Sequence, residues 1–187
     1  MQVAPRDMNA HETVLHFWFV ETRPEAWWSS DPAFDERIRG RFASLHGRAR
    51  LGELSGWRTT PQGRLAEIIV LDQFSRNLFR GTAAAVAQDL AALVLAQEAV
   101  AAQAHLALDP VQRVFLLLPY MHSESRKIHV EAERLFREFT PVVNHDFELR
   151  HKAIVDRFGR YPHRNAALGR DSTPEEVEFL KQPGSAF

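Results

Sequence analysis

The chain contains no cysteine among its 187 residues. It can therefore form no disulfide, no thiolate zinc site and no cysteine nucleophile, which is typical of a reducing compartment. The sequence also lacks a basic segment followed by a long apolar run and a small-residue cleavage site, so no secretory signal is expected. Its uninterrupted apolar runs are shorter than the roughly 18 residues that a membrane helix requires. We therefore expect a soluble cytoplasmic protein with no membrane partner.

An excess of charge of one sign is absent as well. The 23 basic and 24 acidic residues give a formal net charge of -1. No global field attracts nucleic acid, so any anion binding must be local and no nucleic-acid partner is expected. A chain of this length can bury roughly 70% of the surface that it exposes when unfolded. Because no low-complexity linker divides it, we expect residues 1–187 to form a single domain.

Signals for helix starts are frequent. A capping side chain precedes a proline, which suits the first helical position, at Asp31-Pro32, Thr60-Pro61, Asp109-Pro110 and Thr173-Pro174. Glu176 follows Thr173 by three residues and completes a capping box. These signals predict helices that begin at each of the prolines.

Apolar spacing extends these starts into helices. After Asp31, an inward stripe recurs at intervals of four and three residues, on Phe34, Ile38, Phe42, Leu45 and Ala49. The segment from Leu65 to Leu71 leaves almost no polar face, which predicts a central, buried helix. Thr82 is expected to cap an alanine-rich helix that reaches toward Ala104.

The remaining helices are predicted in the same way. They are an opening segment near 14–20, then 111–118 ending near Pro119, 123–139, 145–158 with Gly159 as its stop, and a short terminal helix to Lys181. No convincing alternating strand is present. The predicted fold class is therefore all-α, a compact stack of about eight antiparallel helices. No regular repeat period is found, and the tetratricopeptide consensus is absent.

Three polar blocks interrupt the helical sequence: LDQFSRN (71–77), PYMHSES (119–125) and FGRYPHRN (158–165). Their residue types are costly to bury and make good ligands, acids, bases and anion clamps. The residues concerned are Asp72, Arg76, Asn77, His122, Glu124, His163, Arg164 and Asn165. No block has a spacing that fixes one reaction, so the blocks predict the place of a site but not its chemistry.

In the first block, Asp72 and Arg76 are four residues apart and share one helix face. One interpretation is a structural ion pair, with Asn77 helping to end the helix. The other is a buried carboxylate that is held ionised beside a cleft.

In the second block, Pro119 is expected to end one helix and Ser123 to cap the next, with Glu124 in the first turn. His122 is needed for neither role. Ser123 lacks the glycine-flanked turn that exposes a serine nucleophile. A metal site on His122 and Glu124 matches no known ligand spacing, so neither a metal nor a cofactor is expected.

His151 shares an inward stripe with Phe147, Ile154 and Phe158. It is either a hydrogen-bonded core histidine or a residue that projects into the same cavity as His122.

In the third block, Gly159 and Pro162 force a turn that is expected to present His163, Arg164 and Asn165 together. The surrounding stretch is the most basic of the chain, and guanidinium groups favour carboxylate or phosphate. The alternative is a C-terminal segment that is strapped to the core by arginine pairing with carboxylates such as Asp72.

The order of these segments resembles a bacterial family known as domain of unknown function 924. The resemblance rests on HFWF, on WW before DPAFD, on LAEIIVLDQFSRNLFRGTAAAVAQD, on LLLPYMHSES and on RFGRYPHRNAALGRDSTPEEVEFL, and it spans Val14 to Leu180. It implies an all-helical, tetratricopeptide-like fold and no known reaction, substrate or cofactor. Its signature blocks add Gln73 and Ser123 to the residues above. The family usually has glutamine at His129, so no family-wide role is expected there.

Three functions are compatible with these residues. The first is a binding module that holds a peptide or a small anionic ligand in a polar cleft formed by Asp72, Arg76, Asn77, His122, Glu124, His151, His163, Arg164 and Asn165. The second is a hydrolase or acid/base enzyme whose catalytic candidates are His122, Glu124, His163 and Asp72. The third is a purely structural polar network, with function in oligomer contacts. The first is favoured, because no nucleophile or metal pattern is present.

Overall fold

The computed structural model describes residues 10–186, and every regular element within them is helical. The α-helices are α2 (Ala10–His16), α3 (Pro32–Ala49), α4 (Pro61–Ile69), α5 (Ser75–Leu78), α6 (Asp89–Ala101), α7 (Pro110–Met121), α8 (Arg126–Phe139), α9 (Val142–Phe158) and α10 (Pro174–Phe179). Shorter π or 3-10 turns are η1 (Phe17–Glu21), η2 (Pro24–Trp28), η3 (Ser55–Thr59), η4 (Val70–Phe74), η5 (Ala83–Ala85), η6 (Ala104–Ala107) and η7 (Pro162–Arg164). The predicted all-α class is confirmed.

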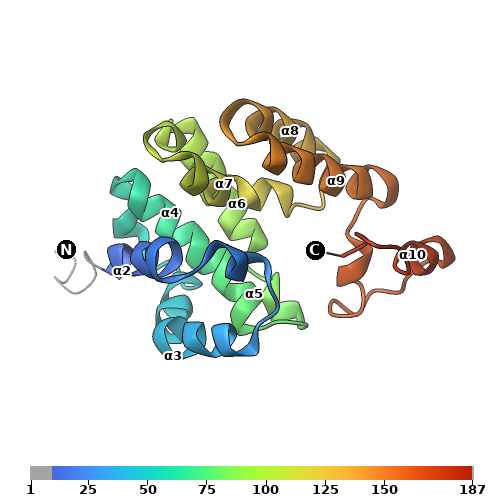
Figure 1. Cartoon of the computed structure of the whole chain (residues 1–187), viewed down its shortest axis with the longest axis horizontal. Coiled ribbons are helices and arrows are strands. Elements are labelled where there is room, and N and C mark those ends of the chain that lie inside the picture. Colours follow the sequence, from blue (N-terminus) through green and yellow to red (C-terminus); the bar gives the residue numbers. More distant parts are fainter. Residues whose placement is uncertain (1–9, 187) are drawn as a thin grey trace.

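The helices form a compact stack around α4, which packs against α2, α6 and α7 (Figure 1). The stack continues from α7 to α8 and from α8 to α9, and α10 lies at the far end from α2. The predicted compact stack is thereby confirmed. The tetratricopeptide-like repeat that the resemblance implies stays a prediction.

The apolar residues form two cores of unequal size. The main core includes apolar residues from Leu65 in α4 to Leu71 in η4. This segment is at most 2% exposed, as its lack of a polar face predicted. A smaller core contains Ile154, Val155 and Tyr161, with Phe158 and Phe179 packed against it. The C-terminal segment after α9 therefore has apolar contacts of its own.

The four proline-marked helix starts are confirmed at α3, α4, α7 and α10. The Asp31 carboxylate accepts the amide of Ala33 at 2.9 Å, and the Thr60 hydroxyl accepts the amide of Gly63 at 3.1 Å. Thr173 and Glu176 form the predicted capping box, and Asp109 forms a second one with its N3 glutamine.

The predicted start of the alanine-rich helix is wrong. The Thr82 hydroxyl donates to the carbonyl of Phe79 instead of capping a helix, and α6 begins only at Asp89. The predicted stop at Pro119 is wrong too, because α7 continues to Met121. Proline removes one amide donor from the helical hydrogen bonds, but after Pro119 the His122 amide again donates to the carbonyl four residues earlier, that of Leu118.

The predicted starts of the next two helices are displaced. Ser123 does not cap α8; its hydroxyl accepts the amide of Ser125 at 3.2 Å, and α8 begins at Arg126. α9 begins at Val142, directly after a proline and before the predicted His145. Phe147 is 43% exposed, so it does not lie on the inward stripe of His151.

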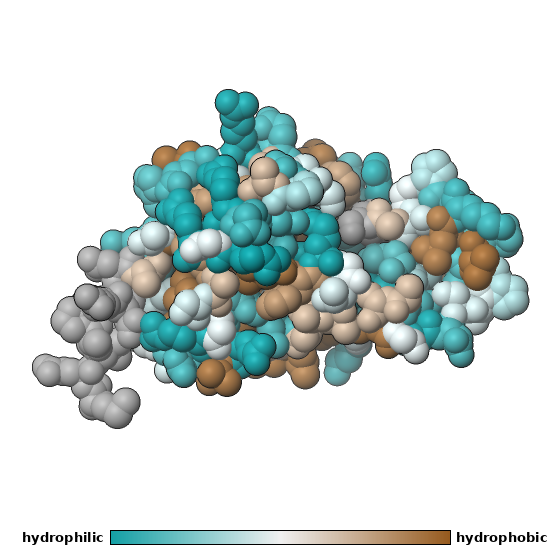
Figure 2. Space-filling model, turned by 90° about the horizontal axis from the view of Figure 1, so that it is seen from below, coloured by the Kyte–Doolittle hydropathy of each residue, from teal (hydrophilic) through white to brown (hydrophobic). Residues whose placement is uncertain are grey.

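One helical stretch, residues 83–101, is long and apolar enough by length and composition alone to cross a membrane. A single such stretch is weak evidence for a membrane helix, and its Asp89 is bonded to arginines of the chain. Figure 2 shows one face of the molecule, where hydrophilic residues predominate and hydrophobic ones form small groups. Small apolar groups of this kind are ordinary on a protein surface.

A pair of glycine substitutions tests the packing at the start of α4. A Cβ on Gly63 would lie 2.0 Å from the carbonyl oxygen of Trp57, whereas a Cβ on Gly40 meets nothing within 4 Å. Gly63→Ala should therefore lower the free energy of unfolding by about 1–3 kcal/mol. Gly40→Ala, at an exposed position inside α3, should raise it by about 0.5–1 kcal/mol. Urea unfolding of both variants measures the difference in the free energy of unfolding. Equal effects would show that the backbone of Gly63 does not lie tightly against the Trp57 carbonyl.

Candidate functional site

Asp72 lies on a π-helical turn, η4, between α4 and α5. All five side chains of this turn are buried, and Asp72 itself has no exposed surface. A π turn inserts a residue into the helical register, and such turns are frequent at functional sites. Here the turn brings a carboxylate into the main core. The sequence offered a buried carboxylate as one of two interpretations, but it did not predict the π turn.

Three side chains surround the Asp72 carboxylate. Its Oδ1 lies 2.7 Å from His122 Nδ1 and 3.1 Å from Arg76 Nη1, and its Oδ2 accepts from Gln73 Nε2 at 2.6 Å. Burial alone would raise the pKa of Asp72, but Arg76 and His122 outweigh it and hold the pKa far below its usual range. Asp72 is therefore ionised at neutral pH, and the ion pair expected from the four-residue spacing is present.

Asp89 joins Arg76 to the C-terminal segment. Arg76 donates to Asp89 with both terminal nitrogens, at 2.9 and 3.1 Å, and Arg164 Nη1 lies 3.2 Å from Asp89 Oδ2. The sequence did not single out Asp89, because the helix was predicted to begin at Thr82. As the first residue of α6, Asp89 also suits the positive end of the helix dipole.

These bonds define the central cluster, which consists of Asp72, Arg76, Asp89, His122 and Arg164. Its members come from η4, α5, α6, the residue after α7, and η7. Two carboxylates and two guanidinium groups balance in charge. Because burial disfavours the charged form, the pKa of Arg164 is lowered, whereas Asp72 and Asp89 outweigh burial and raise that of Arg76.

Two more histidines and a tyrosine adjoin the central cluster. The Tyr161 ring centre lies 5.8 Å from that of His151, 5.6 Å from that of His163 and 4.7 Å from the Arg164 guanidinium carbon. Burial lowers the pKa of His151 to about 3 and of His163 to about 4. Burial and then Arg76 also lower the pKa of His122. All three imidazoles are therefore neutral at pH 7.

The first interpretation of His151, a hydrogen-bonded core histidine, agrees with its contacts, whereas a cavity shared with His122 stays a prediction. Its Nδ1 donates to the carbonyl oxygen of Phe147 at 2.8 Å, as a core histidine does. It also lies near the cluster, since its ring faces the same Tyr161 ring that His163 contacts.

Glu124 and Asn165 belong to a different group, here called the C-terminal network. Glu124 accepts the amide of Tyr161 at 2.7 Å and a bidentate pair from Arg170 at 2.6 and 2.9 Å. Asn165 is 1% exposed and accepts from Arg170 at 3.0 Å. Both side chains therefore hold the C-terminal segment in place. Burial would raise the pKa of Glu124, but Arg170 outweighs it and lowers the pKa.

The expectation that the third block presents His163, Arg164 and Asn165 together is corrected by these contacts. Arg164 reaches Asp89, whereas Asn165 lies in the C-terminal network. Asn77 is separate from both groups, because it donates to Asp35 at 2.7 Å beside Arg80. The nine predicted site residues thus divide among three places.

A buried polar group next to the central cluster was missed. His129 is fully buried, with Nδ1 2.7 Å from Glu148 Oε1 and Nε2 3.1 Å from the Tyr161 hydroxyl, which donates to Met121. Burial raises the pKa of Glu148. The available signal was the position of His129 beside the α8 stripe, but nothing local indicated its partner.

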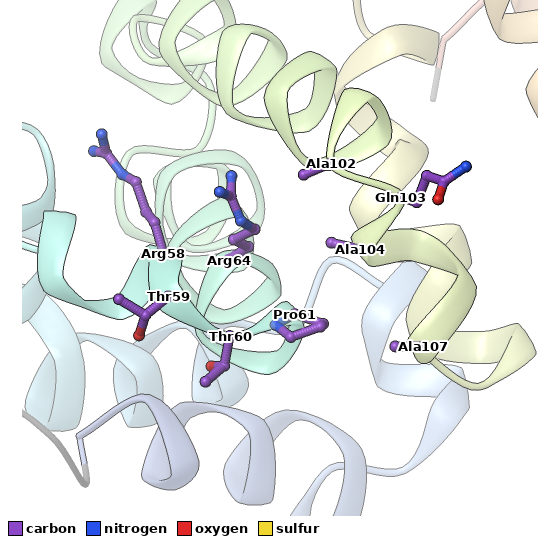
Figure 3. A pocket seen from close by; sticks show the side chains of 9 residues that line it. All are labelled: Arg58, Thr59, Thr60, Pro61, Arg64, Ala102, Gln103, Ala104 and Ala107. Carbon is purple, nitrogen blue, oxygen red and sulfur yellow. The ribbon is translucent and has the colours of Figure 1, made fainter.

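Two hollows among the described residues have no residue of the central cluster in their lining. One, of about 360 Å³, lies between the start of α4 and the loop before η6, with Arg58 and Arg64 on one side and Ala102 on the other (Figure 3). The second, of about 380 Å³, includes Asn77. In the described range 10–186, no group of three or more His, Asp or Glu side chains could hold a metal ion.

Comparison with known proteins finds two matches. A model of a family described as bacterial protein of unknown function (DUF924) matches residues 14–184. A solved structure of a protein of unknown function from Agrobacterium tumefaciens is 38% identical, with a TM-score of 0.86 over 92% of this chain and 97% of that one. A search of curated proteins finds no match.

The pH dependence of stability tests the charge of Asp72. Asp72→Asn leaves Arg76 without one of its two carboxylates and should lower the free energy of unfolding at pH 7 by about 3–5 kcal/mol. Because its folded pKa is depressed, Asp72 stabilises fully above its unfolded pKa of about 4 and loses this effect as pH falls. The difference between wild type and variant should therefore shrink below pH 4.

The matched control is Asp156→Asn, which breaks an exposed pair with Lys152. It should change stability by less than about 1 kcal/mol. Urea titrations at pH 2.5 to 7 measure both variants. An Asp72→Asn effect that stays constant down to pH 2.5 would mean that the carboxyl has the same pKa in the folded and the unfolded protein.

Proposed function

The chain belongs to the bacterial family of proteins of unknown function DUF924, and we propose that it binds a small anionic ligand at the central cluster. The observation that carries the proposal is the position of Arg164. Among the described residues, its guanidinium meets one carboxylate oxygen, Asp89 Oδ2, at 3.2 Å. Arg76 already donates to both oxygens of that carboxylate. Arg164 is thus the guanidinium of the cluster whose N–H donors are not all used by carboxylates of the described residues.

The chemistry of these donors selects the ligand. A guanidinium presents a planar fork that matches the two oxygens of a carboxylate or phosphate. An anion beside Arg164 would also favour its charged form, which burial disfavours. The neutral imidazole of His122 supplies a further donor or acceptor without adding charge.

The exposed area favours a small ligand over a peptide. Side-chain exposure is 11% for Arg164, 14% for His122 and 17% for Asp89. A peptide would have to contact more surface than these three largely buried side chains expose. The Arg58 guanidinium in the hollow of Figure 3 is already bound by Glu67, with two contacts of 2.7 Å.

The rival hypothesis is a purely structural network. It is supported by the direct bonds among Asp72, Arg76, Asp89 and His122, which tie α5, α6 and α7 together. The two hypotheses differ in their response to added anions, because a structural network has no reason to bind them.

The test is the thermal stabilisation of the protein by phosphate and succinate at constant ionic strength. A ligand of the native state raises the melting temperature, and the rise grows with the logarithm of the ratio of ligand concentration to Kd once that ratio is large. Arg164→Gln should weaken this response about tenfold or more in Kd, since it removes the bidentate donor. Arg157→Gln is the matched control: Arg157 also lies 4.7 Å from a ring centre and pairs with one glutamate. That variant should respond as wild type does.

Succinamide serves as the neutral analogue of succinate in the same assay. Stabilisation by the amide as large as that by the acid would contradict an arginine clamp. If wild type responds to neither anion and Arg164→Gln merely lowers the melting temperature, the structural hypothesis is correct.

A further inference from the structure

His122 is held in one protonation state by a fully buried partner. Its Nδ1 lies 2.7 Å from Oδ1 of Asp72, an ionised carboxylate that can only accept. The proton of the neutral imidazole therefore resides on Nδ1, and Nε2 carries the lone pair. This fixed tautomer is the arrangement that a general base requires.

The two partners differ in their access to solvent. The Asp72 side chain is 0% exposed, whereas His122 is 14% exposed and follows the last residue of α7. The carboxylate thus holds the imidazole from inside the core. Arg164, the residue proposed to bind the anion, is connected to the same cluster through its ion pair with Asp89.

The nucleophile for such a base is water. Among the described residues, no serine, threonine or tyrosine hydroxyl is hydrogen-bonded to His122. The adjacent Ser123 hydroxyl accepts the amide of Ser125, and the Tyr161 hydroxyl donates to Met121. Burial also raises the pKa of Tyr161, which keeps its hydroxyl protonated.

We infer that His122 is a general base, positioned by Asp72, which activates water to hydrolyse a small ester whose anionic group is held by Arg164. This inference rests on the proposed function, because Arg164 must first bind the anion. Esters are favoured over amides because of the weak acid catalysis that the site offers to the leaving group. His151 and His163 are neutral at pH 7, so we assign the proton that the leaving group receives to protonated His122, and alcohols leave more readily than amines.

The reaction balances without a co-reactant other than water. His122 Nε2 takes one proton of the water as the water oxygen bonds to the ester carbonyl carbon, and the carbonyl π electrons move to its oxygen. When the carbonyl re-forms, the bond to the alcohol oxygen breaks, and that oxygen takes the proton from Nε2. The products are an acid and an alcohol.

The pH profile follows from the charges around His122. Asp72 and Asp89 favour its protonated form, Arg76 disfavours it, and His151 and His163 are neutral neighbours. Burial and Arg76 prevail and lower the pKa of His122. Because the neutral form is the base, kcat/KM should rise with pH through this lowered pKa and be level by pH 7.

The probes are the mono-4-nitrophenyl ester of succinate, which is anionic, and 4-nitrophenyl acetate, which is neutral. Wild type should hydrolyse the succinate ester with the higher kcat/KM. His122→Gln keeps a donor for Asp72 but has no base, and it should lose about 10²–10⁴-fold in rate. His16→Gln, at an exposed pair with Glu21, is the control and should retain the wild-type rate.

Asp72 is tested separately as a positioning residue. In Asp72→Asn the carboxamide can donate to Nδ1, which moves the proton of His122 to Nε2. Nitrogen-15 NMR at pH 7 should show the proton on Nδ1 in wild type, and the pH profile of the variant should change shape rather than only height. A wild-type His122 protonated on Nε2 would overturn the inference even if Asp72→Asn proves too unstable for kinetics.

The remaining outcomes separate the two proposals. Hydrolysis that survives in folded His122→Gln, or is absent in wild type that still binds succinate through Arg164, overturns general-base catalysis and leaves anion binding intact. Loss of the Arg164-dependent response to succinate itself overturns both. A larger loss for the succinate ester than for the acetate ester in Arg164→Gln supports both.

Discussion

The burial of one ionised carboxylate, that of Asp72, determines the arrangement of the polar residues. A charge in the interior is costly unless it is paired and hydrogen-bonded. Asp72 meets this requirement with Gln73 from its own turn, Arg76 from α5 and His122 from the end of α7. The ends of helices far apart in sequence are thereby fixed to one point.

The same requirement applies to the partners of Asp72, because each of these polar side chains needs hydrogen-bond partners for its remaining donors. Arg76 has more donors than Asp72 can accept, and it uses the remainder on Asp89 at the start of α6. Asp89 in turn meets Arg164. Other contacts also fix the position of the C-terminal segment: Tyr161 packs in the smaller apolar core, and Glu124 accepts two hydrogen bonds from Arg170. Arg164 is therefore brought to the cluster by contacts elsewhere, which leaves its donors available.

The sequence predicted what is local. The starts of α3, α4, α7 and α10 depend on a cap and a proline that are adjacent in the chain, and the Asp72–Arg76 pair depends on a four-residue spacing. The π turn at η4 was not predictable, because it follows from the packing of the whole turn. The pairs of Glu124 with Arg170 and of Arg164 with Asp89 join residues 46 and 75 positions apart, respectively, and no local pattern specifies such partners.

A comparison within the chain distinguishes the central cluster from an ordinary buried ion pair. Glu67 is also 0% exposed, and each of its carboxylate oxygens accepts one bond from the Arg58 guanidinium at 2.7 Å. This bidentate pair satisfies both partners, so a structural role is sufficient to explain it. Buried ion pairs of this kind are often no more stabilising than apolar packing. Asp72 instead shares its charge between an imidazole and a guanidinium, on a π turn. Arg164 lies beside this group with one long ion pair of 3.2 Å to Asp89. The central cluster therefore differs from the closed pair of Glu67 in holding a guanidinium with a single carboxylate contact, and the proposed anion binding rests on this difference.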